Sequence, residues 1–193
     1  PNRGDKVGLR QVFSNVADQI RLGELIASGH LVPPRTFIID VGVQDELRAV
    51  RRSGDDFDMG EVARVMDTVP VTDAVVKHWQ EKAGGRQTVA FCSTVAHAEH
   101  VAAAFNAAGV PTVMVTGDMP EGERRSVLAA YARGEARIVV NVAVLTEGWD
   151  HPPTSCVILL RPSSFKCTMI QMVGRGLRTV DSAEHPGIVK RDC

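Results

Sequence analysis

Apolar runs alternate with amphipathic stretches along the C-terminal part of the chain, from about residue 71 onward. The apolar runs are predicted as strands at residues 87–92, 112–115, 137–141 and 156–160. The amphipathic stretches have apolar residues at helical spacing and are predicted as helices at residues 73–83, 94–109, 120–134 and 165–177. Because the strands are apolar throughout instead of alternating, they are typical of a parallel sheet that helices cover on both faces. The pattern therefore predicts an α/β fold.

The first 70 residues have a weaker pattern that Gly and Pro interrupt. Apolar spacing predicts helices at residues 9–20, 22–26, 45–52 and 59–67. Gly29 is expected to end the second of these helices, and residues 36–41 are predicted as a strand. We therefore expect a small, mainly helical segment over residues 1–70 that leads into one α/β domain over residues 71–193.

The composition is that of a globular protein and narrows the function classes. The 193 residues are 44% hydrophobic and 23% charged, which excludes a wholly disordered or coiled-coil chain. The net charge of −1 argues against a uniformly positive surface, although a local basic groove remains compatible with it. No apolar run approaches the roughly 18 residues of a membrane span, so we expect no membrane partner.

The cysteines and the chain ends add two expectations. None of the four cysteines (Cys92, Cys156, Cys167 and Cys193) forms a CxxC pair, so we expect reduced thiols in a cytoplasmic protein and no metal site. The chain starts at Pro1 without a Met and stops abruptly at Cys193. We expect both ends to be boundaries within a longer protein.

Several common catalytic motifs are absent from the sequence. No Lys is followed by Ser or Thr, so there is no GxxxxGK[ST] phosphate loop. There is also no GxGxxG after a strand and no GxSxG nucleophile elbow. His97-Ala98-Glu99 has the spacing of a deaminase motif, but no PCxxC follows it, so a solvated helix face is the simpler interpretation. The chain therefore carries no phosphate-binding loop of its own.

The most informative segment is Gln171-Met172-Val173-Gly174-Arg175-Gly176-Leu177-Arg178. Its two arginines are three residues apart, which places them on one face of a helix end. Arginine suits bidentate contact with phosphate, and phosphoryl transfer requires positive charge near the transferred group. An arginine pair alone is usually a surface feature. Here, however, it follows a strand, a tight turn with Gly148 and a carboxylate at Asp150.

Four blocks in this order resemble the second RecA-like lobe of superfamily 2 helicases. Residues 88–93 resemble motif IV, and residues 117–124 resemble the block after it. Residues 145–150 (LTEGWD) resemble motif V, and residues 171–178 fit the Q/H-x-x-G-R-x-x-R pattern of motif VI. The amino-acid sequences of the last two blocks are most similar to those of RadD-like and type III restriction-type DEAD/DEAH-box DNA helicases. The resemblance covers about residues 71–180 and implies a RecA-like sheet sandwiched by helices.

The resemblance implies a site for ATP and Mg²⁺ in a cleft between two lobes, with the phosphate loop on a first lobe that this chain lacks. Arg175 and Arg178 match the arginine fingers, and Gln171 matches the position that couples ATP to nucleic acid. Gly148, Asp150 and Gly174 match positions at the nucleotide end of the cleft. The implied partners are that first lobe and DNA, with RNA possible.

A nucleic-acid track requires small donors and backbone N–H groups near phosphates. Donors of this kind lie on the loops and a helix next to the strand ends, at Ser93, Thr94, Thr116, Gly117, Arg124 and Thr146. Each Ser or Thr can equally be a helix cap or turn residue. The sequence departs from the resembled pattern at Glu121, where many members have Gln, and at Val142-Ala143, where a Thr-Asp pair is common. The Asn141 amide is expected to take over the lost phosphate contact.

The leading hypothesis is the C-terminal half of an ATP-dependent DNA helicase or translocase, which by itself would hydrolyse little ATP. An alternative is a degenerate RecA-like lobe that binds nucleic acid or protein without motor activity. A third hypothesis, a small α/β enzyme with its own pocket, is disfavoured because no nucleophile, base or metal cluster is recognisable.

Overall fold

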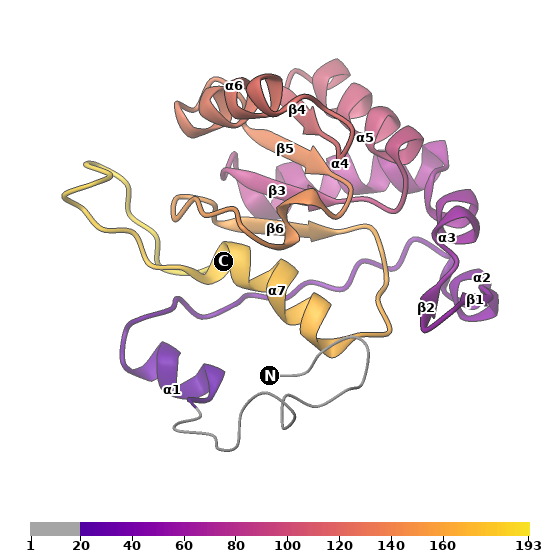
Figure 1. Ribbon diagram of the computed structural model, residues 1–193, viewed down its shortest axis with the longest axis horizontal. Helices are drawn as coiled ribbons and strands as arrows, with labels where there is room; N and C mark the ends of the chain where they lie inside the picture. The colour runs from indigo at the N-terminus through magenta and orange to yellow at the C-terminus, as the bar shows by residue number, and fades with distance from the viewer. Residues whose placement is uncertain (1–19) are drawn as a thin grey trace.

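The computed structural model describes residues 20–193 (Figure 1). Its centre is a parallel sheet of β3 (Thr88–Phe91), β4 (Thr112–Val115), β5 (Ile138–Asn141) and β6 (Cys156–Leu159). The strand order is β4-β5-β3-β6. All of these strands were predicted to within two residues at either end, and the α/β fold is confirmed.

Helices cover both faces of this sheet: α4 (Val69–Ala83), α5 (Val95–Ala107), α6 (Glu121–Ala132) and α7 (Lys166–Leu177). One face packs on α4 and α5, where Trp79 and Phe105 meet edge to face beside Ala90 of β3. The other face packs on α6 and α7, where Tyr131 and Met172 are buried with Val89 and Phe91 of β3, among others. Successive residues of β3 thus point into different cores, which explains why its run is apolar throughout.

One helix start differs by more than one residue from the sequence prediction. Helix α4 begins at Val69 instead of residue 73, because Pro70 is tolerated in the first helical turn. The N-cap of α7 is Phe165, and the backbone N–H of the preceding Ser164 donates to Asp56 at 2.7 Å. Thr94 caps α5 as predicted, and its hydroxyl accepts from the His97 backbone N–H at 3.2 Å.

The segment before the sheet contains α1 (Leu22–Ala27), α2 (Gln44–Ala49), β1 (Arg52–Ser53), β2 (Asp56–Phe57) and α3 (Met59–Met66). The short hairpin of β1 and β2, which turns at Gly54 with φ 64°, was not predicted. The predicted helix at residues 9–20 lies outside the described residues. Val62 and Met66 of α3 belong to the same buried cluster as α4 and α5, so α3 packs directly on the domain. The division at residue 70 stays a prediction.

The predicted strand at residues 36–41 is wrong. This stretch has no strand partner, and Ile38 is 89% exposed. Its apolar run has the composition of a strand, but pairing needs a free neighbouring edge, which local sequence cannot supply. Instead, the Phe37 ring lies between the cationic groups of Arg35 and Lys82, at 5.8 and 5.6 Å from its centroid.

Candidate functional site

Arg175 of α7 ties down the loop that follows β5. Its Nε and Nη2 donate to the Thr146 carbonyl at 3.2 and 2.5 Å, and Nη1 donates to the Trp149 carbonyl. One guanidinium therefore holds two backbone carbonyls of residues 143–150, which we call the motif V loop. Burial, with the charge of Arg178 nearby, lowers the pKa of Arg175.

Two more side chains at the C-terminal part of α7 reach the same loop. Arg178 Nη1 lies 2.8 Å from Asp150 Oδ2, and both side chains of this ion pair are about half exposed. Gln171 Nε2 donates to Glu147 Oε1 at 3.0 Å. The structure therefore brings together the predicted set of Gln171, Arg175, Arg178 and Asp150. It adds Glu147 and two backbone carbonyls, which sequence reasoning missed.

The backbone of the motif V loop explains its tight path. After β5 the chain takes a positive φ of 59° at Ala143, a short 3₁₀ turn over Val144–Thr146, and a second positive φ of 70° at Gly148. Asn141 stabilises this path from below: its Nδ2 donates to the Ala90 carbonyl at 2.9 Å, and its Oδ1 accepts from the Leu145 N–H at 3.2 Å. Asn141 is fully buried, so the expectation that its amide contacts phosphate is wrong.

An aromatic cluster supports the other side of the motif V loop. The Trp149 ring lies 6.0 Å from that of Tyr131 and 6.2 Å from that of His151. The Tyr131 hydroxyl lies 3.0 Å from Thr154 Oγ1, and His151 Nε2 lies 3.1 Å from Gln87 Oε1. Sequence reasoning did not single out this cluster, because its members come from α6, the loop and the start of β3.

We expect acid to destabilise this cluster. Burial, followed by the charges of His185 and Lys190, lowers the pKa of His151 from 6.5 to about 4. The neutral ring therefore stabilises the fold fully above about pH 6.5, and this contribution is lost as the pH falls through about 4. A His151→Gln variant should show a flatter fall of melting temperature between pH 7 and 4 than the unchanged chain. An equal fall in both proteins would contradict this role.

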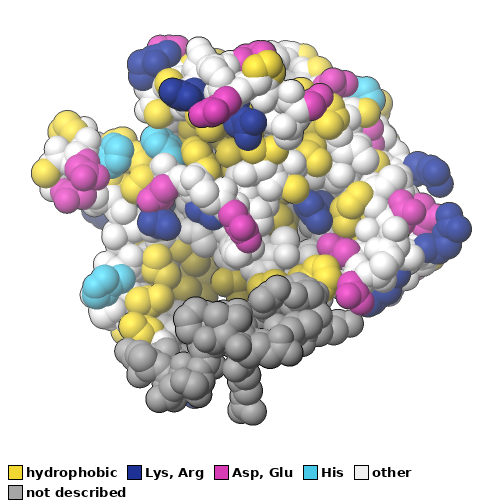
Figure 2. All heavy atoms as spheres, in the orientation of Figure 1, with side chains coloured by type: hydrophobic (Ala, Val, Ile, Leu, Met, Phe, Trp, Pro, Cys, Tyr) yellow, Lys and Arg dark blue, Asp and Glu magenta, His cyan; other side chains and the backbone are white. Residues whose placement is uncertain are grey.

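Gly174 and Arg178 line a shallow groove of about 360 Å³ together with His30, Leu31, Pro152 and Thr179. Gly174 faces open space, since a Cβ built there would have no atom within 4 Å. Acidic and basic side chains intermix over the face of the molecule that Figure 2 shows. On that face, individual Lys and Arg side chains present the positive charge instead of a broad basic surface.

The predicted track residues lie next to the carboxyl ends of parallel strands. Ser93 and Thr94 follow β3, Thr116 and Gly117 follow β4, and Thr146 follows β5. The Ser93 hydroxyl lies 2.9 Å from His97 Nδ1, and the Thr116 hydroxyl lowers the pKa of Asp118 through a hydrogen bond.

Arg124 of α6, the remaining predicted track residue, donates to the Met119 carbonyl at 3.1 Å. Ser93, Thr94, Thr116 and Arg124 therefore have local partners. For Ser93, Thr94 and Thr116 these contacts are compatible with cap or turn roles, and contact with nucleic acid stays a prediction for all of the track residues.

The arginine site contacts the loop after β5, where Arg175 binds the Thr146 carbonyl. Helix α7 returns antiparallel to β6, and its C-terminal end packs over the start of that strand: a Cβ at Gly176 would lie 2.7 Å from Val157. The motif V loop begins at the carboxyl edge of the sheet and ends beside Arg178 (Figure 1). It therefore connects the predicted track to the arginine site.

The described residues, 20–193, contain no feature typical of a metal centre or of a membrane span. Within this range, no His, Cys, Asp and Glu side chains gather in a group of three or more that suits a metal ion. None of the helices in the same range has both the length and the apolar character needed to cross a membrane. The four cysteines are free thiols, and Cys92 is the buried one among them.

Comparisons with known proteins agree with the fold and the motifs. Residues 70–180 match the helicase conserved C-terminal domain family. The chain is 28% identical over 190 residues to a Saccharomyces cerevisiae protein provisionally named ATP-dependent helicase IRC3, covering 97% of this chain and 27% of that protein. It is also 28% identical over 192 residues to a provisionally named mitochondrial ATP-dependent helicase, irc3, of Schizosaccharomyces pombe, covering 99% of this chain and 30% of that protein.

A solved structure extends the comparison. A DEAD box protein from the hyperthermophile Methanococcus jannaschii superposes with a TM-score of 0.51 at 20% identity, over 56% of this chain and 29% of that one. The chain spans less than a third of the length of the two curated helicase relatives from yeast described above. Because residues 70–180 match its family model, the chain belongs to the helicase conserved C-terminal domain family. Its parallel sheet between helices is the fold of the second RecA-like lobe of superfamily 2 helicases.

Proposed function

We propose that the chain is the C-terminal lobe of an ATP-dependent DNA helicase or translocase, and that Arg175 and Arg178 act on ATP held by a preceding first lobe. The observation that carries this proposal is the convergence of both arginines on one loop at the end of α7. Two guanidinium groups at one site can neutralise the charge that develops on a transferred phosphoryl group. The family match supports the assignment of the chain to a C-terminal helicase lobe.

The two arginines differ in how freely they can reach a phosphate. Arg178 is in a half-exposed ion pair with Asp150, and such pairs contribute only about 0–1 kcal/mol. An incoming γ-phosphate, which carries more charge than one carboxylate, can therefore displace Asp150 from Arg178. The donors of Arg175 are committed to two loop carbonyls, so Arg175 requires the motif V loop to move. We infer that Arg178 engages first and Arg175 second.

The same arrangement suggests how ATP and nucleic acid are coupled. Gln171 holds Glu147, and Gly148 and Asp150 lie on the same loop, in which the predicted track residue Thr146 directly precedes Glu147. When Arg175 leaves the carbonyls of Thr146 and Trp149, the loop loses its main tie to α7. ATP with Mg²⁺ would be held mainly by the first lobe. DNA as the bound strand and a cytoplasmic location stay predictions.

This function is tested by the ATP turnover of the 193-residue chain alone. We expect turnover near the background rate, since the chain has no phosphate loop. The full-length protein, by contrast, should hydrolyse ATP faster when single-stranded DNA is added. Mg²⁺-dependent turnover by the isolated chain, unchanged in Arg175→Ala, would refute the proposed division of labour. A full-length protein that binds DNA and never hydrolyses ATP would favour the binding module without motor activity.

A further inference from the structure

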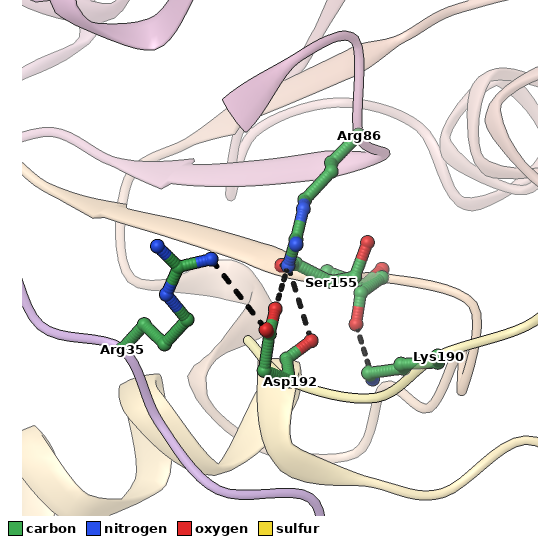
Figure 3. Close-up of polar contacts among 6 residues, drawn as sticks. Arg35, Arg86, Ser155, Lys190 and Asp192 are labelled. Atoms are coloured by element: carbon green, nitrogen blue, oxygen red, sulfur yellow. Dashed lines mark hydrogen bonds and ion pairs between the residues drawn. The ribbon is translucent and has the colours of Figure 1, made fainter. Parts of the chain in front are cut away.

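A carboxylate at the far end of the chain joins segments that lie far apart in the sequence. Asp192 accepts from Arg86 Nη1 at 2.5 Å and lies 3.6 Å from Arg35 Nη1 (Figure 3). Arg86 Nη1 is also 3.2 Å from the Asp192 carbonyl and 3.4 Å from the Ser155 carbonyl. Asp192 is thus held between Arg86, which lies two residues before β3, and Arg35, which lies in the segment after α1.

The segment held by this clamp, residues 30–35, is called the strap here. Its Arg35 N–H donates to the Cys193 carbonyl at 2.5 Å, and the Cys193 N–H donates back to the Pro33 carbonyl at 3.1 Å. Strap and chain end therefore form a small backbone-paired unit. The strap also carries Arg35 into the ion pair with Asp192.

The chain end is itself anchored to the domain. Lys190 Nζ donates to the carbonyls of Pro152 and Thr154 at 2.8 and 2.5 Å (Figure 3 shows the Lys190 side chain). Since Arg86 and Lys190 both bind backbone close to the start of β6, Asp192 is fixed relative to the sheet. Any segment that pairs with Asp192 is fixed relative to the sheet as well.

The other end of the strap reaches the arginine site. The Val32 N–H donates to the Leu177 carbonyl at 2.8 Å, and Leu31 forms an antiparallel bridge with Arg178. Leu177 is the last residue of α7, where backbone carbonyls lack helical partners. Arg178 then continues in extended conformation, with φ −63° and ψ 140°. The strap therefore supplies the backbone contacts that hold Arg178 at the end of the helix.

We propose that Asp192 is a positioning residue, which holds the strap against the end of α7 and thereby sets where Arg178 meets the nucleotide. This inference rests on the proposed function for its catalytic part, because it gives Arg178 a nucleotide to meet. Its structural part, the dependence of the strap on Asp192, stands independently. Asp192 touches no substrate in this scheme and acts through the strap alone.

The structural part is tested by amide hydrogen exchange on the 193-residue chain. Asp192→Asn keeps the shape of the side chain and removes its charge. We expect the Val32 and Arg35 amides to exchange about tenfold faster or more, because hydrogen bonds to charged groups are among the stronger ones. The Val89 and Val139 amides of the sheet should keep their protection. Glu135→Gln, which breaks the exposed ion pair with Arg133 elsewhere on the surface, is the matched control and should leave Val32 unchanged.

The catalytic part is tested by steady-state ATP turnover in the full-length protein. Asp192→Asn should lower kcat by about 10- to 100-fold with little change in KM, since a displacement of about 1 Å can cost about 10² in rate. Asp192→Glu, which keeps the charge, should recover most of the rate. If Asp192 only stabilised the fold, Asp192→Asn would not lower kcat selectively over KM, and restoring the charge in Asp192→Glu would not recover the rate.

Two results would overturn the inference, and a third would implicate the proposed function instead. Unchanged exchange at Val32 and Arg35 in Asp192→Asn would refute the clamp. Faster exchange with unchanged kcat would refute the link to Arg178. If Arg178→Ala also left kcat unchanged, the proposed function would fall, whatever the exchange data show for the strap.

Discussion

Replacing Arg178 or Arg175 by Ala in the full-length protein is expected to lower ATP turnover by about 10³–10⁵ while ATP binding changes little. Arginine fingers act on charge that develops in the transition state, so their loss reduces kcat more than affinity. Turnover measured with saturating ATP and DNA, alongside equilibrium binding of a fluorescent ATP analogue, separates the two effects.

Lysine variants distinguish the roles of the two arginines. Arg178→Lys keeps a charge opposite Asp150 and should retain part of the activity. Arg175→Lys cannot reproduce the contacts that Nε, Nη1 and Nη2 make with two carbonyls, so it should lose nearly as much activity as the Ala variant. Arg125→Ala breaks an exposed pair with Glu121 on α6 and is the matched control. Equal losses in Arg125→Ala and Arg178→Ala would contradict a specific role at the nucleotide.

The second large effect is expected at Gly176, where Gly176→Ala should destabilise the chain by about 1–3 kcal/mol. A Cβ at this buried position would overlap Cys193 Sγ and lie 2.7 Å from Val157 Cγ2. Gly176 is enclosed between α7, β6 and residue 193, so an added methyl group would force its neighbours apart. Urea unfolding followed by circular dichroism measures the change in the free energy of unfolding.

Gly174→Ala is the matched control for this prediction, because its Cβ would meet no atom within 4 Å. At this half-buried helical position with open space beside it, Ala should stabilise by up to about 1 kcal/mol through its higher helix propensity. Adding Cys193→Ala to Gly176→Ala removes the Sγ and should restore part of the loss. A Gly176→Ala chain as stable as the Gly174→Ala chain would show that α7 packs less closely on β6 than described here.

The sequence predicted the sheet well because its signals are local. Strands 112–115 and 156–160 are apolar runs bounded by polar or Gly-containing turns, and burial on both faces is the physical origin of that pattern. Residues 36–41 carry a similar apolar run and form no strand. Strand formation requires a partner edge as well as a suitable composition, and only the tertiary structure shows whether such an edge is available.

The sequence also predicted which α7 side chains belong to one site, since the spacing of Gln171, Arg175 and Arg178 places them along one helix end. It did not predict what they touch. Arg175 binds backbone carbonyls, and carbonyl positions depend on the loop path through Ala143 and Gly148. The role expected of Asn141 failed for the same reason: residue type indicated a phosphate donor, whereas burial made it a support for the loop.

By itself, the sequence determined the α/β class and the order of the strands and helices from residue 71 onward, and it predicted that Arg175 and Arg178 share one site, because periodicity and motif spacing are properties of neighbouring residues. Only the tertiary structure decided the contacts between distant segments: Asp192 with Arg35 and Arg86, Leu31 with Arg178, and the aromatic support of Trp149. These contacts join residues more than fifteen positions apart in the chain, where no local pattern constrains them. They form when the sheet and helices pack together, and that packing determines the positions of Arg175 and Arg178.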